Sequence, residues 1–275
     1  MGQSPKDGED GIKQGQRRRK NLEPERPVGC LGNVGSTPAL VEKSMKQTVI
    51  KIGYWSSVLA LLFSLGYLAS AILMAMRPPP VWTNLAAFVD GASPISLLAF
   101  SCIQLNEFLI APVYVALFCC LHEYAPEDKR ILTRLGLCFM VALMVLGDQL
   151  VWVHFGVMRR IFSKGITPGM EDFLHWNFDS PLVSSGALGW TFFIGLAFLV
   201  VAPIFSGDRL ARSLRNSFAA AGGFALFGVV GSFLGSVPLT AIYILGFTLS
   251  VIALAIFSAI LFKRLGAQAV RSAES

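Results

Sequence analysis

The chain has few charged residues for its length. Only 15% of its 275 residues are Asp, Glu, Lys or Arg, whereas soluble domains carry about 25%. Its mean hydropathy is +0.60, and hydrophobic residues make up 54% of the sequence, in long blocks rather than alternating runs. These features exclude a pair of ordinary soluble domains and a disordered chain, and they indicate that most of the chain lies in lipid.

Cysteine is scarce, and the signatures of soluble enzymes are absent. The five cysteines show no CxxC spacing, which excludes a disulfide scaffold and favours simple packing roles. The sequence has no P-loop, no GxGxxG after a strand and no GxSxG nucleophile elbow. We therefore expect no cofactor, and the sequence favours a protein that is not an enzyme.

Six apolar segments are long enough to cross a bilayer. A hydrocarbon core of roughly 30 Å needs about 20 residues of helix, and a backbone in lipid must satisfy its own hydrogen bonds. The sequence predicts an all-α membrane protein: a six-transmembrane-helix bundle with a disordered N-terminal tail and a short external interfacial helix. The expected domains are a basic cytoplasmic tail at 1–48, the bundle at 49–265 and a short cytoplasmic tail at 266–275. The expected spans are 49–76, 93–120, 132–155, 187–206, 217–236 and 238–262.

Positive charges predict the orientation of these spans. With six spans, 4 of the 23 Lys and Arg residues lie on one side (Arg77, Arg159, Arg160 and Lys164), and the remaining 19 lie on the side of the two termini. Basic residues stay on the cytoplasmic side. We therefore expect a multi-pass protein of the cell (cytoplasmic) membrane with both termini in the cytoplasm.

The tail is basic, but its pattern does not favour nucleic acid. Its densest cluster runs from Arg17 to Lys20, without interleaved aromatic residues and diluted by nearby acids. Such a cluster suits contact with anionic lipid headgroups or a solvated tail that helps hold the amino end inside. The lipid bilayer, and not nucleic acid, is the expected partner.

The longest predicted connection, 156–186, carries a helix signal of its own. Thr167 is a suitable N-cap, and a proline follows it at the first helical position. A helix at 168–176 would place His175 one turn after Glu171 and two aromatic residues on an apolar face. This pattern is typical of an interfacial helix on the outer leaflet, or of a lid over an opening between the spans.

Two acids lie inside the expected spans. Glu107 is near the middle of the second span, and Asp148 is about two turns from the external end of the third. Ionisable groups are costly in hydrocarbon and are therefore candidates for function. Gln104 and Tyr114 share a helical face with Glu107, and Pro112 frees a backbone carbonyl nearby. These groups together predict a wet, enclosed pocket.

The third span contributes a second polar face. Asp148 and Trp152 lie one turn apart, and His154 flanks them. A carboxyl group among aromatic rings suits a cationic or amphiphilic ligand, or it stays protonated. We therefore predict an outward-opening cavity between the second and third spans, with Glu107 at its floor and His175 near its mouth. The candidate ligand-binding residues are Gln104, Glu107, Tyr114, Asp148, Trp152, His154 and His175.

Three functions remain open on these residues. The favoured one is binding or transport of a small amphiphilic or cationic molecule. The others are a membrane-embedded enzyme that isomerises or cyclises a lipophilic substrate by proton transfer, and an accessory or assembly protein. The polar groups could equally fix helix packing, at about 0.6 kcal/mol per contact. Zinc ligand types are present without the spacing of a metal site, so no metal is expected; they are His154, His175, Glu171 and Asp172.

The last two spans carry no buried acid. Gly231 and Gly235 form a GxxxG pair in the fifth span, and Ala219 and Gly223 form a second small-residue pair. Such faces let helix backbones approach closely, so we expect packing inside the bundle, with a homodimer through Gly231 and Gly235 as the alternative. The sixth span is almost purely Ile, Leu, Ala and Phe and is expected to face lipid.

Four stretches between residues 93 and 206 carry a resemblance: SPISLLAFSCIQLNEFLIAPVYVAL, YAPEDKR, DQLVWVHFGVMRR and GALGWTFFIGLAFLVVAPIF. Over this part, less than half of its length, the chain resembles a group of uncharacterised bacterial six-helix integral membrane proteins. The group has no assigned activity. The resemblance therefore implies a bacterial cytoplasmic membrane and six helices, and it implies no catalytic residue.

Overall fold

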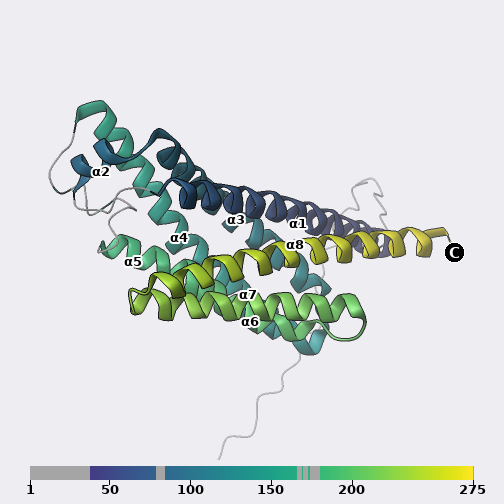
Figure 1. The fold of residues 1–275 in the computed structure, drawn as a ribbon. Helices are drawn as coiled ribbons and strands as arrows, with labels where there is room; N and C mark the ends of the chain where they lie inside the picture. Colours follow the sequence, from purple (N-terminus) through teal and green to yellow (C-terminus); the bar gives the residue numbers. More distant parts are fainter. Residues whose placement is uncertain (1–37, 79–83, 166–168, 170–172, 174–179, 275) are drawn as a thin grey trace, which may run out of the picture. The chain divides into compact units, whose positions relative to one another are not determined.

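The chain folds into helices over the whole part that the structure describes. The computed structural model describes residues 38–78, 84–165, 169, 173 and 180–274 (Figure 1). Of these residues, 92% are helical and none lies in a strand. Six helices are long and apolar enough to cross a membrane. The predicted all-helical class and the six long apolar helices are confirmed.

Five of the six spans are continuous helices, and the fourth is composite. The continuous ones are α1 (Pro38–Met76), α3 (Pro94–Tyr124), α4 (Arg130–Lys164), α7 (Arg209–Phe233) and α8 (Val237–Glu274). The fourth joins α5 (Pro181–Leu188), a π-turn η3 (Gly189–Phe193), α6 (Ile194–Val201) and a 3-10 turn η4 (Ala202–Ile204). Short elements precede α3 and α4, namely α2 (Leu85–Gly91) and η1 (Glu127–Lys129).

Polar residues and proline set several helix ends. Ser93 and Ser180 each precede a proline, and each side chain accepts a hydrogen bond from an amide of the first turn. Asp208 caps α7 in the same way, 2.8 Å from the Ala211 nitrogen. Pro126 follows the end of α3, where its missing amide and ring stop the helix. The turns between the spans are thus encoded locally.

The largest extensions beyond the predicted spans are at the ends of α1, α4, α7 and α8, and α7 begins at Arg209 instead of near 217. α1 begins at Pro38, so residues 38–48 are helical and not part of a disordered tail. α8 continues to Glu274 instead of ending near 262, and α4 reaches Lys164 instead of ending near 155. These extensions carry charged residues, which hydropathy excludes from a span although they favour helix. The expected interfacial helix at 168–176 lies, apart from two residues, outside the described residues.

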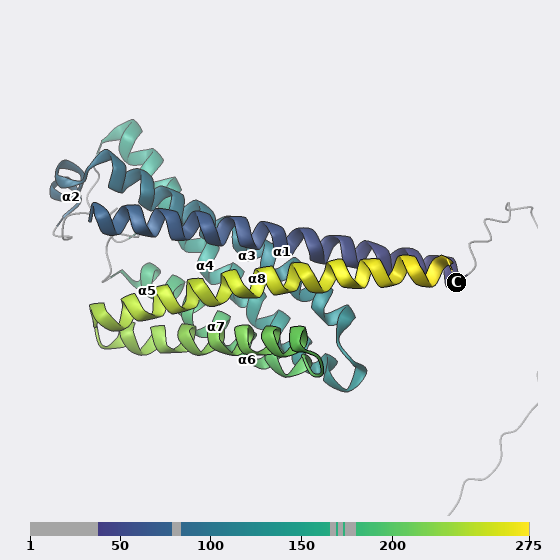
Figure 2. The same cartoon turned by 45° about the vertical axis from the view of Figure 1, so that its right-hand side comes forward.

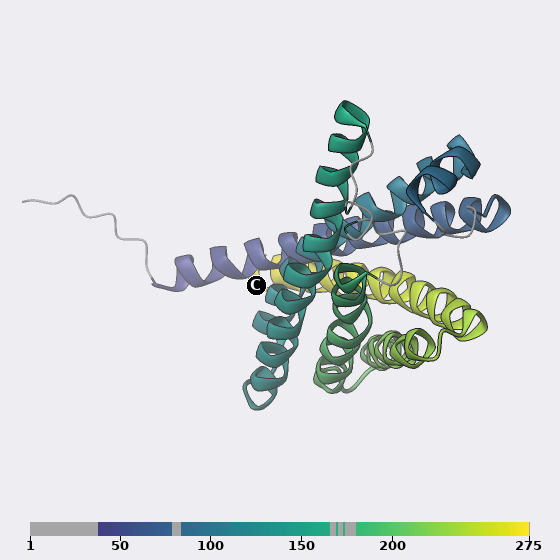
Figure 3. The same ribbon diagram turned by 90° about the vertical axis from the view of Figure 1, so that its left-hand side faces the viewer.

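The six spans form a closed ring. Each span packs against its neighbours in sequence, from α1 through α3, α4, α6 and α7 to α8, and α8 packs back against α1. Figures 1 and 2 show α1 and α8 side by side along much of their length, although they lie at opposite ends of the chain. Figure 3 shows the C-terminal part of α4 diverging from α7 and α8. α8 therefore has two protein faces and is not purely a lipid-facing wall.

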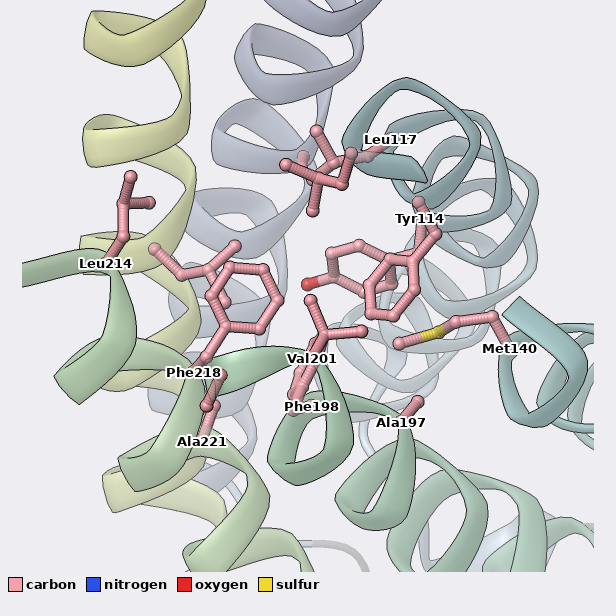
Figure 4. Close-up of a cluster of buried hydrophobic side chains, with 14 of the residues drawn as sticks. Tyr114, Leu117, Met140, Ala197, Phe198, Val201, Leu214, Phe218 and Ala221 are labelled. Carbon is pink, nitrogen blue, oxygen red and sulfur yellow. The ribbon is translucent and has the colours of Figure 1, made fainter. Parts of the chain in front are cut away.

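An aromatic core fills the space where α3, α4, α6 and α7 meet (Figure 4). Phe198 of α6 is its centre, with ring centroids of Tyr114 and Phe218 each 5.6 Å away at nearly perpendicular angles. Such edge-to-face pairs contribute about 0.5–1.5 kcal/mol beyond area burial. Phe118 also packs against Phe198, with centroids 6.0 Å apart. This core fixes the rotation of α3, and with it the direction of Glu107, two turns before Tyr114.

Glycine allows α6 and α7 to cross at close range. A Cβ added to Gly222 would lie 2.8 Å from the carbonyl oxygen of Gly195. Gly223 and Ala219, which the sequence analysis paired, are exposed, and an added Cβ at Gly223 meets nothing. The small-residue helix packs inside the bundle as expected, but the closest approach uses Gly222 and not Gly223.

The GxxxG pair is divided between a helix contact and a turn. Gly231 packs against α8, where an added Cβ would lie 3.2 Å from Leu239 Cβ. Gly235 lies beyond the end of α7 with a φ of 58°, a left-handed conformation that favours glycine. Gly231 is thus occupied within the chain, and a homodimer through this pair stays a prediction.

Candidate functional site

Glu107 lines a small cavity in the middle of the bundle. The cavity has a volume of about 50 Å³ and lies between α1, α3, η3 and α8. At a rise of 1.5 Å per residue, Glu107 is about 20 Å along α3 from Pro94. A buried water needs about 10–15 Å³ and a drug-sized ligand several hundred. The space therefore suits a few waters or a very small ligand.

Aromatic rings form most of the cavity wall. They come from all three surrounding helices and from the π-turn: Phe63, Tyr67, Tyr114, Trp190, Tyr243 and Phe247. Ser64, Asn106 and Thr248 add small polar groups, and Ile110, Ile244 and Val251 complete the wall. None of these lining residues is basic. Among the lining residues, Glu107 is consequently the only one with an acidic or basic side chain of the Asp, Glu, Lys or Arg kind.

A carboxylate oxygen at this cavity lacks a hydrogen-bond partner. Glu107 Oε2 is buried and bonds no other group in the described structure. The nearby Tyr114 is 1% exposed, and its hydroxyl interacts with Ser64. Buried polar groups in folded proteins almost always have a partner, and a missing one calls for an explanation such as an occupant. The Glu107 oxygen therefore points to something polar or charged that belongs in the cavity.

The smaller polar groups of the wall are held by their own helices. Ser64 Oγ donates to the Ala60 carbonyl at 2.7 Å, and Asn106 Nδ2 donates to the Cys102 carbonyl at 2.7 Å. The other end of Asn106 packs against α1, since an added Cβ at Gly66 would lie 2.9 Å from its Oδ1. These bonds use the hydroxyl proton of Ser64 and one of the two amide protons of Asn106, and they leave both oxygen atoms as acceptors.

A π-turn brings Trp190 to the cavity. In η3 the Ile194 amide donates to Gly189 O, five residues back, and also to Thr191 O, three residues back. The Trp190 carbonyl accepts a hydrogen bond from the Tyr243 hydroxyl of α8 at 3.1 Å. π-turns occur often at functional sites. Here the turn joins the composite span to α8 beside Glu107.

Trp190 also reaches α4. Its indole Nε1 is buried without a hydrogen-bond partner, and an added Cβ at Gly147 would lie 2.6 Å from it. Asp148 is the next residue on α4, and its Oδ1 is buried and unpartnered as well. The carboxyl groups of Asp148 and Glu107 interact electrostatically. Trp190 thus connects the cavity that contains one acid with the helix that carries the other.

Of the residues predicted from sequence, Glu107 and Tyr114 line the cavity. Gln104 is fully buried one turn from Glu107 but does not line it. Asp148 lies outside the wall, on the α4 side of Trp190. The cavity is bounded by α1, α3, η3 and α8, and not by the second and third spans alone, where the sequence predicted an opening.

The remaining predicted residues lie elsewhere. Trp152 is 71% exposed, and its ring stacks on Phe108 with centroids 6.5 Å apart. His154 is 3% exposed and packs edge-on against Phe100, with centroids 6.0 Å apart. His175 lies outside the described residues, as do Glu171 and Asp172. Within the described part of the chain, no three His, Cys, Asp or Glu side chains cluster as metal ligands.

Several cavity residues were missed by sequence reasoning. Tyr67, Trp190, Tyr243 and Thr248 line the wall but were not among the candidates. One signal was available, because Tyr243 is the one tyrosine in a span composed mostly of Ile, Leu, Ala and Phe. The contribution of Trp190 depends on the π-turn, which has no periodic signature.

A second hollow is larger but chemically plain. It has a volume of about 750 Å³, lies between α5, η3, α7 and α8, and has no charged residue in its lining. The hydroxyls of Thr191 and Thr240 there donate to carbonyls of their own helices. Its lining therefore offers no charged partner for a ligand, and the smaller cavity at Glu107 is the candidate functional site.

Comparison with protein-family models, with curated proteins and with solved structures found no match to this chain.

Proposed function

We propose that this chain is a multi-pass membrane protein that binds a small organic cation of the alkylammonium class in the cavity at Glu107. Six helices of sufficient length and hydropathy support the membrane location. The observation that carries the ligand class is the buried, unpartnered Oε2 of Glu107 in a cavity without a basic residue in its wall. A bound cation would supply the positively charged partner that the cavity wall does not provide for this carboxylate.

The aromatic wall supports an organic cation over a metal ion. Rings of Tyr, Trp and Phe attract ammonium groups through their faces, by about 0.5–2 kcal/mol each when desolvated. Metal ions such as Mg²⁺ and Ca²⁺ instead require several oxygen ligands, and the wall has one carboxylate. The volume of about 50 Å³ favours a cation of few heavy atoms over a larger amphiphile.

In the proposed orientation, the protein lies in a bacterial cytoplasmic membrane and both termini are on the cytoplasmic side. Lys129 Nζ donates to Pro203 O at 2.9 Å, so the α3–α4 and α6–α7 turns lie at one end. Arg264 of α8 pairs with Asp208 at the same end, at 3.4 Å. These turns are rich in basic residues, which stay inside.

Cysteine labelling of intact cells tests this orientation. We expect a membrane-impermeant maleimide to label an Asp90→Cys variant in α2 above the wild-type background, and to leave an Asp128→Cys variant in η1 unlabelled until the cells are lysed. Both positions are exposed. The reverse pattern would overturn the orientation and leave the ligand proposal standing.

Equilibrium dialysis with radiolabelled methylammonium tests the ligand. We expect saturable binding of one cation per chain to the detergent-purified protein. Tetramethylammonium, which has more heavy atoms, should compete more weakly than unlabelled methylammonium because the cavity is small. Glu107→Gln keeps the shape of the side chain but removes the charge. Loss of one partner of a buried charge pair costs about 2–5 kcal/mol, so affinity should fall about 30-fold or more.

Glu123→Gln is the matched control, because Glu123 is an exposed acid on the same helix. It should bind methylammonium as the wild type does. Both variants should elute as the wild type does in size-exclusion chromatography. Wild-type protein without saturable binding, or a Glu107→Gln variant with unchanged affinity, would refute the proposed function.

A further inference from the structure

The cavity at Glu107 is expensive to leave empty and ionised. No basic residue lines it, and Oε2 has no partner in the described structure. Removing a carboxylate from water without a compensating charge costs far more than removing a neutral carboxyl group. A proton on Glu107 therefore solves the same problem that a bound cation solves. The proton and the cation therefore compete for the same carboxylate, so Glu107 holds one or the other.

The other titratable groups around Glu107 cannot neutralise it. Tyr67 on α1, Tyr114 on α3 and Tyr243 on α8 line the same cavity, and phenols are neutral at physiological pH. Trp190 is the residue that η3 contributes to the cavity wall, and its indole does not titrate. α4 contributes Asp148, a second acid that interacts electrostatically with Glu107. Two acids that interact without a base between them tend to share protons.

Asp148 is suited to receive a proton from the cavity. Its Oδ1 is buried without a partner, while the residue as a whole is partly exposed. It therefore has one atom toward the interior of the bundle and access toward the surface. Trp190 lines the cavity and contacts Gly147 beside Asp148, so one side chain packs against the surroundings of both acids.

We infer that the cavity exchanges one proton for one cation, and that Asp148 takes up the proton that leaves Glu107. This inference rests on the proposed function. In the exchange, the O–H bond of the Glu107 carboxyl breaks, and the carboxylate that remains binds the ammonium group. The proton forms an O–H bond with the Asp148 carboxylate, which later releases it to water. One positive charge enters the cavity for each one that leaves.

Proton release and binding are measured on the same full-length protein in detergent. Methylammonium is added to weakly buffered protein with a pH-indicator dye, and binding is measured by dialysis. We expect one proton released per cation bound. Where Glu107 is protonated in the empty cavity, the affinity should fall about tenfold for each unit by which the pH is lowered, as linkage with one proton requires.

Asp148→Asn separates a proton acceptor from a packing residue. The variant should bind methylammonium with the full release amplitude, but stopped-flow release should slow by about 100-fold, the usual contribution of a positioned acid or base. Asp148→Glu restores a carboxyl group and should recover most of the rate. Asp90→Asn, which removes an exposed acid of α2, should leave the rate unchanged.

The outcomes distinguish the two proposals. Methylammonium binding without proton release, or with an affinity independent of pH, overturns the exchange and preserves the cation site. Release at the wild-type rate in Asp148→Asn removes Asp148 from the exchange. An Asp148→Asn variant that fails to fold is replaced by Asp148→Ser, which also removes the carboxyl group, and an unaltered release rate in that variant overturns the same assignment. No binding by the wild type overturns the proposed function and this inference together.

Discussion

Gly222 should not tolerate a single added methyl group. An alanine Cβ there would lie 2.6 Å from Leu199 Cγ, 2.8 Å from Gly195 O and 3.0 Å from Leu199 N. The leucine side chain can turn away, but the two backbone atoms cannot. To move the carbonyl from 2.8 Å to an ordinary contact of about 3.4 Å, α6 and α7 must separate by about 0.6 Å. The Phe198–Phe218 pair crosses the same interface and would loosen with it.

The expected cost follows from two opposing terms. Overpacking a tight interface costs about 1–3 kcal/mol, whereas alanine in place of glycine favours a helix by about 0.5–1 kcal/mol. Gly222→Ala should therefore lower the free energy of unfolding by about 1–2 kcal/mol. Gly223→Ala is the matched control, because a Cβ at Gly223 meets no atom within 4 Å. It should gain the helix term alone, so the two variants should differ by about 2 kcal/mol.

Equilibrium unfolding in mixed detergent micelles, followed by circular dichroism, measures this difference. Adjacent positions and identical substitutions keep helix propensity and detergent effects equal between the variants. If Gly222→Ala proved as stable as Gly223→Ala, the close crossing of α6 and α7 would be refuted. A gain in stability for Gly222→Ala would refute it more strongly.

Substitutions at three further positions test other contacts by the same unfolding measurement. Tyr243→Phe should cost about 1 kcal/mol, because the Trp190 carbonyl loses its hydrogen bond; no loss would contradict the link between η3 and α8. Gly147→Ala should cost about 1–3 kcal/mol and alter the tryptophan fluorescence, since its Cβ displaces the indole; an unchanged spectrum would contradict that contact. Asp208→Ala should cost about 1 kcal/mol through loss of the α7 N-cap. Asp208→Asn keeps a capping oxygen and loses only the exposed ion pair with Arg264, so it should cost less than about 0.5 kcal/mol; equal costs for both variants would contradict the capping role.

The fold class was predictable because hydropathy and length are local properties. A run of about 20 apolar residues has few alternatives to a helix, and the predicted start of the second span at 93 is close to the observed start at Pro94. The start of α7 at Arg209 was missed, because the predicted span began at 217. The polar ends of α1 and α8 were also missed. They are helical at 38–48 and beyond 262, but they lack the apolar composition on which the prediction depended.

The candidate site was predictable on one helix only. Helical periodicity correctly placed Glu107 and Tyr114 on a common face of α3, and both line the cavity. The elements opposite that face depend on how the ring closes, which no short pattern encodes. Tyr67 of α1 and Tyr243 of α8 were therefore not predicted from the sequence. Trp190 was missed because the five-residue hydrogen-bonding step of η3 departs from the 3.6-residue period.

The return of α8 to α1 has a consequence for biosynthesis. Chains are made from the amino end, and earlier segments organise first. The Glu107 face of α3 is therefore synthesised well before Tyr243, Phe247 and Thr248, which enclose it from α8. A nascent chain that stops after α7 exposes its acid to lipid or to a chaperone until the final helix arrives. Ribosome-stalled intermediates lacking α8 should accordingly be the form most readily degraded by membrane proteases.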